Sequence, residues 1–187
     1  MTNAPVFAVV GHPNKGKSSV VATLSQNDAI AIALEPGTTR ARQDYPLSVD
    51  GQKLYTLVDT PGFQRPRRVL QWLEAHSISA SDHPETVRAF VLQHRGDDRF
   101  VDECELLAPI VEGAGIIYVV DGSVPYSAEH EAEMTILRWT GRPSLALINS
   151  IGEDDYSDTW QAALGQFFQV VRKFDAVRTP FEQHLSL

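Results

Sequence analysis

The sequence predicts an α/β fold in which a mostly parallel six-stranded sheet carries helices on both faces. Short apolar runs alternate with helix-length segments along the 187 residues. Near-continuous apolar runs are typical of parallel strands that are buried on both faces. Only one pair of runs is joined by a short turn, at residues 49–52 (VDGQ), where Asp-Gly supplies the positive-φ residues that a tight hairpin needs. We therefore expect one antiparallel strand.

Each expected element follows from the local pattern of apolar residues. Strands are expected at the six apolar runs: residues 6–10, 44–49, 53–58, 115–120, 144–149 and about 168–173. Helices are expected in the longer segments that separate them, since parallel strands need crossover connections of this length: residues 17–26, 102–113, 127–140 and 154–167.

Two stretches depart from this alternation. Residues 26–43 read as a long loop, and loops of this length in compact domains are usually functional or disordered. Residues 63–101 form an extra segment in which we expect helices at 66–76 and 84–95. The length suits a single domain over residues 1–187. Because the final FEQHLSL reads as the start of a helix, we expect a fragment of a longer protein.

Composition limits the class of protein. The chain is 43% hydrophobic and 21% charged, as in soluble globular domains. A net charge of −8 argues against a surface that coats nucleic acid, and we find no direct nucleic-acid signal, although a local basic patch is compatible with it. A single cysteine, Cys104, excludes an intramolecular disulfide. No signal peptide or apolar run of membrane-spanning length is present, so we expect a cytoplasmic protein without a transmembrane segment.

The stretch GHPNKGKS at residues 11–18 matches the phosphate-loop pattern G-x-x-x-x-G-K-[ST] between an expected strand and an expected helix. Its glycines allow successive N–H groups to point at one anion, and the following helix adds its positive dipole end. We therefore expect a three-layer P-loop NTPase fold in which Lys17 reaches the β- and γ-phosphates and Ser18 binds Mg²⁺. The residues expected to contact the nucleotide here are Asn14, Lys15, Gly16, Lys17, Ser18 and Ser19.

Two further motifs have the chemistry of nucleotide-sensing loops. VDTPG at residues 58–62 places Asp59 where it can hold Mg²⁺ through water and the Gly62 N–H where it can contact the γ-phosphate. PGTTR at residues 36–40 offers a threonine to the same ion and phosphate. Both sets of contacts are lost on hydrolysis, so the two loops can act as switches.

With these three motifs in this order, the sequence resembles translation-factor-class GTPases of the Era/TrmE/EngA type over nearly its whole length. More narrowly, it is similar to the N-terminal GTPase domain of bacterial proteins whose C-terminal region is uncharacterised. The resemblance implies a Mg²⁺-dependent switch that binds GTP and GDP and hydrolyses GTP. It also implies that Thr39 joins Ser18 and Asp59 as a metal ligand. The residues expected to act in catalysis are Lys17, Thr39, Gly62 and Asn14.

The base-reading motif departs from the family pattern. Where the family has N-K-x-D, residues 149–152 read NSIG, so Asn149 is retained and Gly152 replaces the aspartate that accepts two hydrogen bonds from guanine. The acids at 153–155 either substitute for it or cap the next helix, and we favour capping. A second base loop is expected at Asp175 and Ala176. GTP remains the expected ligand, with a less base-selective NTPase that binds ATP as an alternative.

The residue after the DTPG motif is Phe63, which cannot hydrogen-bond the attacking water as a glutamine does. Family members with an apolar residue here include some that place K⁺ beside the phosphates, partly through the asparagine equivalent to Asn14. The side chain of Asn14 therefore either ligates K⁺ or only shapes the loop. Gln64 and Glu74 are other candidates to position water. A nucleotide-gated binding module with negligible turnover is the second alternative.

Two basic features each have two interpretations. Lys15 stands where such loops usually have a small or apolar residue, and it either adds charge near the phosphates or points into solvent, which we favour. The stretch RPRR at residues 65–68 is either a solvated face, which we also favour, or a docking patch for an acidic partner. A protein partner is expected to use the switch loops or residues 63–101.

Overall fold

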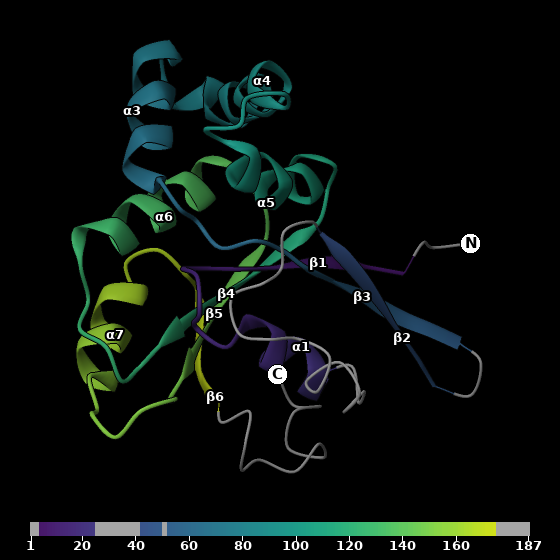
Figure 1. Ribbon diagram of the computed structural model, residues 1–187, viewed down its shortest axis with the longest axis vertical. Coiled ribbons are helices and arrows are strands. Elements are labelled where there is room, and N and C mark those ends of the chain that lie inside the picture. The colour runs from purple at the N-terminus through teal and green to yellow at the C-terminus, as the bar shows by residue number, and fades with distance from the viewer. Residues whose placement is uncertain (1–3, 25–41, 50–51, 175–187) are drawn as a thin grey trace.

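The computed structural model describes residues 4–24, 42–49 and 52–174 (Figure 1). They contain one six-stranded sheet with the order β2-β3-β1-β4-β5-β6. Among these strands only β2 runs antiparallel, to β3, and every other neighbouring pair is parallel. The predicted sheet is therefore confirmed. The strands are β1 (Val6–Val10), β2 (Gln43–Val49), β3 (Gln52–Asp59), β4 (Gly115–Asp121), β5 (Ser144–Asn149) and β6 (Val170–Phe174).

The predicted helices are also present, along with a short 3₁₀ helix, η1 (Ala80–Asp82), that the sequence pattern did not indicate. Helix α7 begins three residues later than predicted. Its N-cap residue is Tyr156, and the Asp155 carboxylate just before it accepts a hydrogen bond from the N–H of Ser157, the first helical residue (2.8 Å). The α-helices are α1 (Lys17–Leu24), α3 (Pro66–His76), α4 (His83–His94), α5 (Val101–Val111), α6 (Ala128–Trp139) and α7 (Ser157–Leu164).

Alternate residues of the central strands build a core on each face of the sheet. On one face, Val9, Ile117 and Val119 pack with the apolar side of α1. On the other, Val10 and Tyr118 join a larger core that includes the inward faces of α3 to α7. Helices therefore cover both faces, as the near-continuous apolar strands predict.

The predicted extra helices, α3 and α4, lie outside α5 and α6 rather than directly on the sheet (Figure 1). Aromatic rings fill the space beneath them: Phe90 of α4 makes edge-to-face contacts with Trp72 of α3 and with Phe100. Cys104 of α5 is buried, as expected for a core cysteine.

The hairpin of β2 and β3 forms one edge of the sheet. Val49 pairs with Gln52 across the predicted Asp-Gly turn, whose two residues lie outside the described part of the chain. Pro46 lacks a backbone N–H to donate, and β2 tolerates this because it is the edge strand of the sheet that the described residues form.

Register brings the carboxyl ends of four parallel strands to one edge of the sheet. Val9 of β1 is level with Asp59 of β3, and Asp121 of β4 is level with Asn149 of β5. In open α/β sheets, ligands bind in the crevice beyond this edge.

None of the helices in the described residues has the length and apolarity that crossing a membrane requires.

Helix α6, which follows β4, begins with a side-chain cap that uses a histidine. The ring Nδ1 of His130 lies 3.2 Å from the Ser127 backbone nitrogen and 2.8 Å from the Ser127 hydroxyl. Burial lowers the pKa of His130 from 6.5 to about 4, and the nearby charges of His12 and Lys15 act in the same direction. The folded protein therefore keeps this ring neutral.

We predict that acidification weakens the fold through His130. On going from about pH 7 to about pH 4.5, the unfolded chain takes up a proton on this ring and the folded chain does not, which removes roughly 1–2 kcal/mol of stability. His130→Asn lacks this effect. The difference in unfolding free energy between His130→Asn and wild type should therefore shift in favour of the variant by this amount when the pH is lowered. Urea unfolding of both proteins at the two pH values measures it. An equal gap at both pH values would contradict the prediction.

Candidate functional site

The loop between β1 and α1 has the backbone that its glycines predict. Gly11 has φ +147°, and a Cβ there would lie 2.3 Å from the Val119 carbonyl oxygen. Gly16 has φ +78°, and a Cβ would lie 2.5 Å from Nδ2 of Asn149. Asn14 takes the left-handed conformation at φ +60° with its side chain exposed. Both glycines are therefore required, by conformation and by space.

Lys17, at the start of α1, turns its ammonium group back over this loop. Only 7% of the residue is exposed, and Nζ donates a hydrogen bond to the His12 carbonyl oxygen (3.0 Å). Burial lowers the pKa of Lys17 to about 8, and the charges of Asp59 and Glu133 oppose this shift. The loop thus keeps a desolvated cation on a neutral carbonyl, which a phosphate oxygen can replace.

Ser18 and Asp59 meet at the end of β3. The Ser18 hydroxyl donates to Oδ2 of Asp59 (2.8 Å), whose residue is fully buried. A hydroxyl and a carboxylate side by side offer oxygen ligands of the kind that Mg²⁺ prefers, so this pair fits the predicted metal site. The third predicted ligand, Thr39, lies outside the described residues, as does the rest of the PGTTR motif.

The DTPG segment rests directly on the phosphate loop. A Cβ on Gly62 would lie 2.4 Å from the backbone nitrogen of Pro13, so only glycine fits here. The next residue, Phe63, donates its N–H to the Gly11 carbonyl oxygen (3.1 Å) and is fully buried in the core. Phe63 therefore fills space beneath the loop and exposes no surface to solvent.

The base-reading loop keeps one polar anchor. Asn149 is buried, with its amide against Gly16, whereas Ser150 is exposed. A Cβ on Gly152 would lie 2.8 Å from the Ser123 hydroxyl oxygen, so the aspartate of the family pattern would displace Ser123.

The three acids that follow this loop do not all serve one purpose. Asp155 accepts the first N–H of α7, and its bonds to Ser157 hold the pKa of its carboxyl below the ordinary value. Glu153 and Asp154 are exposed. Of the three acids, Asp155 thus bonds the start of the helix, but from the position before the N-cap residue, Tyr156. Asp175 and Ala176, expected to form the second base loop, lie outside the described residues.

Lys15 is not solvated, so the interpretation that we favoured is wrong. Its ammonium group lies 3.6 Å from Oδ2 of Asp121 at the end of β4, and its side chain is 18% exposed. The other oxygen of Asp121 accepts hydrogen bonds from the backbone N–H (2.9 Å) and hydroxyl (2.6 Å) of Ser123. Lys15 therefore ties the phosphate loop to the end of β4.

Sequence reasoning missed two buried carboxylates. Glu133 of α6 accepts hydrogen bonds from the His12 ring (2.8 Å) and the Tyr118 hydroxyl (2.9 Å). Glu103 of α5 accepts from the backbone N–H groups of Gln64 (3.0 Å) and Arg65 (2.6 Å), which fixes the chain as it enters α3. The one available signal was position: both glutamates lie within an expected helix, among residues at apolar spacing.

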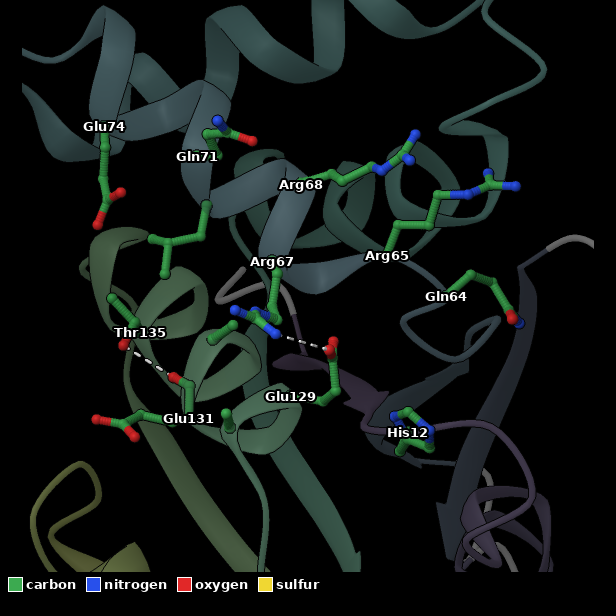
Figure 2. Close-up of a pocket in the computed structure, with 13 residues that line it drawn as sticks. His12, Gln64, Arg65, Arg67, Arg68, Gln71, Glu74, Glu129, Glu131 and Thr135 are labelled. Carbon is green, nitrogen blue, oxygen red and sulfur yellow. Dashed lines mark hydrogen bonds and ion pairs between the residues drawn. The ribbon is translucent and has the colours of Figure 1, made fainter.

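A groove of about 980 Å³ runs between α3 and α6, beside the phosphate loop (Figure 2). An ion pair between Arg67 and Glu129 (3.9 Å), both substantially exposed, spans it. Gln64 lies near His12 at one end and Glu74 lies at the other, so only Gln64 is close to the loop. The groove is lined by His12, Gln64, Arg65, Arg67, Arg68, Leu70, Gln71, Glu74, Ala128, Glu129, Glu131, Ala132 and Thr135.

Proteins with related sequences have been described as GTPases. The chain is 44% identical over 149 residues to GTPase Der of Mycoplasma pneumoniae, covering 79% of this chain and 27% of that protein. It is 30% identical over 166 residues to GTPase Der of Mycolicibacterium vanbaalenii, covering 87% of this chain and 29% of that protein. The chain therefore spans less than a third of the length of these relatives.

Solved structures share the fold at low sequence identity. Era in complex with MgGDPNP and nucleotides 1506–1542 of 16S ribosomal RNA aligns with a TM-score of 0.62 at 17% identity, over the whole of this chain and 55% of that one. The elongation factor SelB of Methanococcus maripaludis, in complex with the GTP analogue GPPNHP, aligns with a TM-score of 0.54 at 15% identity, over 98% of this chain and 32% of that one.

The sequence also matches a protein family over residues 6–150, a range that holds the phosphate loop, the DTPG segment and the strands whose ends form the crevice. That range is well over half of the chain, and the chain therefore belongs to the 50S ribosome-binding GTPase family.

Proposed function

We propose that residues 1–187 form one G domain that binds GTP and GDP at the carboxyl edge of the sheet and hydrolyses GTP as a molecular switch in the cytoplasm. The observation that carries this proposal is the buried ammonium group of Lys17, held on the His12 carbonyl of the glycine-containing loop. A desolvated cation of this kind needs an anionic ligand, and the β- and γ-phosphates supply one. The N–H groups of residues 14–19 would hold the same phosphates.

Ser18, Asp59 and Thr39 would hold Mg²⁺. The ion supplies positive charge against the phosphates, and the Era neighbour was solved with MgGDPNP. Within the chain, Ser18 and Asp59 already share a hydrogen bond, so the two oxygens need little movement to face one ion. Asp59 stays buried at the end of β3, which keeps its carboxylate fixed.

Through Gly62, the DTPG segment at residues 59–62 would respond to the nucleotide bound in the phosphate loop. Its backbone lies against Pro13, and the next residue is bonded to Gly11. A γ-phosphate that engages the Gly62 N–H would therefore pull on the segment that leads into α3. Loss of that phosphate would release it.

For the partner, we propose a protein that docks in the groove between α3 and α6. The groove begins at the phosphate loop and ends on the exposed part of α3, so it spans the path between the nucleotide and the surface. RNA is a less favoured partner for this domain because the chain carries a net charge of −8, even though the Era structure contains ribosomal RNA.

A less base-selective NTPase is the second candidate, and the packing of Gly152 favours it. No carboxylate stands at the position where the family reads guanine, and Ser123 occupies the space that such a side chain would need. Without that carboxylate, binding adenine leaves no buried acceptor of the site unpaired. The site therefore does not discriminate strongly against adenine.

The first prediction concerns the cation in the loop. Lys17→Ala should weaken GTP binding by about 100-fold, because the buried phosphate loses its charge-assisted hydrogen bonds. Lys53→Ala, the same change at an exposed position of β3, should bind like wild type. Isothermal titration calorimetry with GTP and MgCl₂ measures both. Full affinity in Lys17→Ala would refute the proposed site.

The second prediction concerns base selectivity. Wild type should prefer GDP over ADP by no more than about 100-fold, whereas a site with every polar group matched can reach roughly 10⁴–10⁵. Gly152→Asp with Ser123→Gly should raise this preference, because the second change makes room for the new carboxylate. Gly152→Asp alone should gain less. Competition binding with the two diphosphates gives the ratios, and a wild-type ratio near 10⁴ would remove the second candidate.

The third prediction concerns the role of Asn14. We expect GTP hydrolysis to be faster in KCl than in NaCl, and the stimulation to vanish in Asn14→Gly. Glycine removes the side chain and still accepts the φ of +60° at this position, which alanine would strain. Phosphate release in the two salts measures this. Hydrolysis in neither salt, with GTP binding intact, would instead identify a nucleotide-gated binding module.

A further inference from the structure

The backbone and the side chain of His12 each make a hydrogen bond to a different residue. Its backbone carbonyl accepts the hydrogen bond from the Lys17 ammonium group (3.0 Å). Its ring Nδ1 donates to Oε1 of Glu133 on α6 (2.8 Å), across 121 residues of sequence. The side chain is 35% exposed and lines the groove between α3 and α6 at the end nearest the loop (Figure 2). A single residue therefore joins the phosphate loop, helix α6 and the groove.

Each oxygen of Glu133 accepts a hydrogen bond from a protein side chain. Oε1 accepts from His12, and Oε2 accepts from the hydroxyl of Tyr118, which is itself fully buried in β4. The Glu133 carboxylate has no exposed surface, so its donors must come from the protein. Burial raises the pKa of Glu133, and the bonds to these two donors oppose the shift.

Lys17 lies within electrostatic reach of this carboxylate but does not bond it. The charge of Glu133 raises the pKa of Lys17 against the larger effect of burial. Even so, the ammonium group rests on the neutral His12 carbonyl. The bond that Lys17 makes to this carbonyl has one charged partner, whereas a bond to a carboxylate would have two, and inside a protein the second charge adds Coulomb attraction.

We infer that His12 is a positioning residue that masks Glu133 and so keeps Lys17 available for the nucleotide phosphates. The imidazole occupies the carboxylate oxygen that would otherwise attract the ammonium group. Without the imidazole, Lys17 would settle into a buried ion pair with Glu133, and a phosphate would have to break that pair to bind. This inference rests on the proposed nucleotide site.

If His12 masks Glu133, a second substitution that removes the charge of Glu133 should restore GTP affinity. If His12→Ala acted only through lost packing, the second substitution would not restore it. His12→Ala should weaken GTP binding by about tenfold, because the freed oxygen captures Lys17. Adding Glu133→Gln to His12→Ala should restore affinity to within about threefold of wild type, because the competing charge is gone. Glu133→Gln alone should also stay within about threefold. The Kd for GTP with MgCl₂, from calorimetry on the four proteins, forms a complete double-mutant cycle.

Two further variants separate masking from bulk. His12→Asn places an amide donor near the position of Nδ1 and should bind GTP like wild type. His76→Ala, the same side-chain loss at an exposed position of α3 away from the loop, is the matched control and should have no effect. Thermal unfolding of each protein shows that it is folded, and His12→Leu replaces His12→Ala in the cycle if the alanine variant does not fold.

Three results would overturn the inference: wild-type affinity in His12→Ala, a double variant as weak as His12→Ala, or a loss in His12→Asn equal to that in His12→Ala. Failure of the proposed nucleotide site would look different. Lys17→Ala would then bind GTP as tightly as wild type, whatever the His12 variants do.

Discussion

The buried ammonium group of Lys17 is the interaction on which the rest of the site depends. A cation that is 7% exposed is stable only where acceptors lie close to it, and this chain supplies a backbone carbonyl together with the charge of Asp59. The glycines of the loop and the carboxylate at the end of β3 both serve this requirement, whereas the glutamate of α6 is bonded to His12 and Tyr118. The position of Lys17 thus depends on the buried carboxylate of Asp59 as well as on the residues of the loop itself.

The loop is also held by two polar side-chain contacts to other elements. Lys15 binds Asp121 at the end of β4, and the His12 ring binds Glu133 on α6. Each contact joins the loop to a different element, β4 for Lys15 and α6 for His12. Lys15 and His12 therefore fix the loop to the elements that surround it.

Most of the fold could be predicted from the sequence, because the strands are short apolar runs and the Asp-Gly turn marks the one reversal. The strands at 6–10 and 144–149 have the predicted bounds. The partners of His12 and Lys15 could not be predicted, because they lie more than 100 residues away and only the register of the sheet brings them close. The start of α7 lies three residues later than predicted, and the acids before it remain outside the helix.

The contact between Gly62 and Pro13 has a consequence for how motion passes through the molecule. The two backbones lie against each other, Phe63 donates its N–H to Gly11, and the N–H groups of Gln64 and Arg65 are bonded to Glu103. This series of backbone contacts links the loop to the start of α3. We therefore expect a shift of the loop to move the first turn of α3 as well.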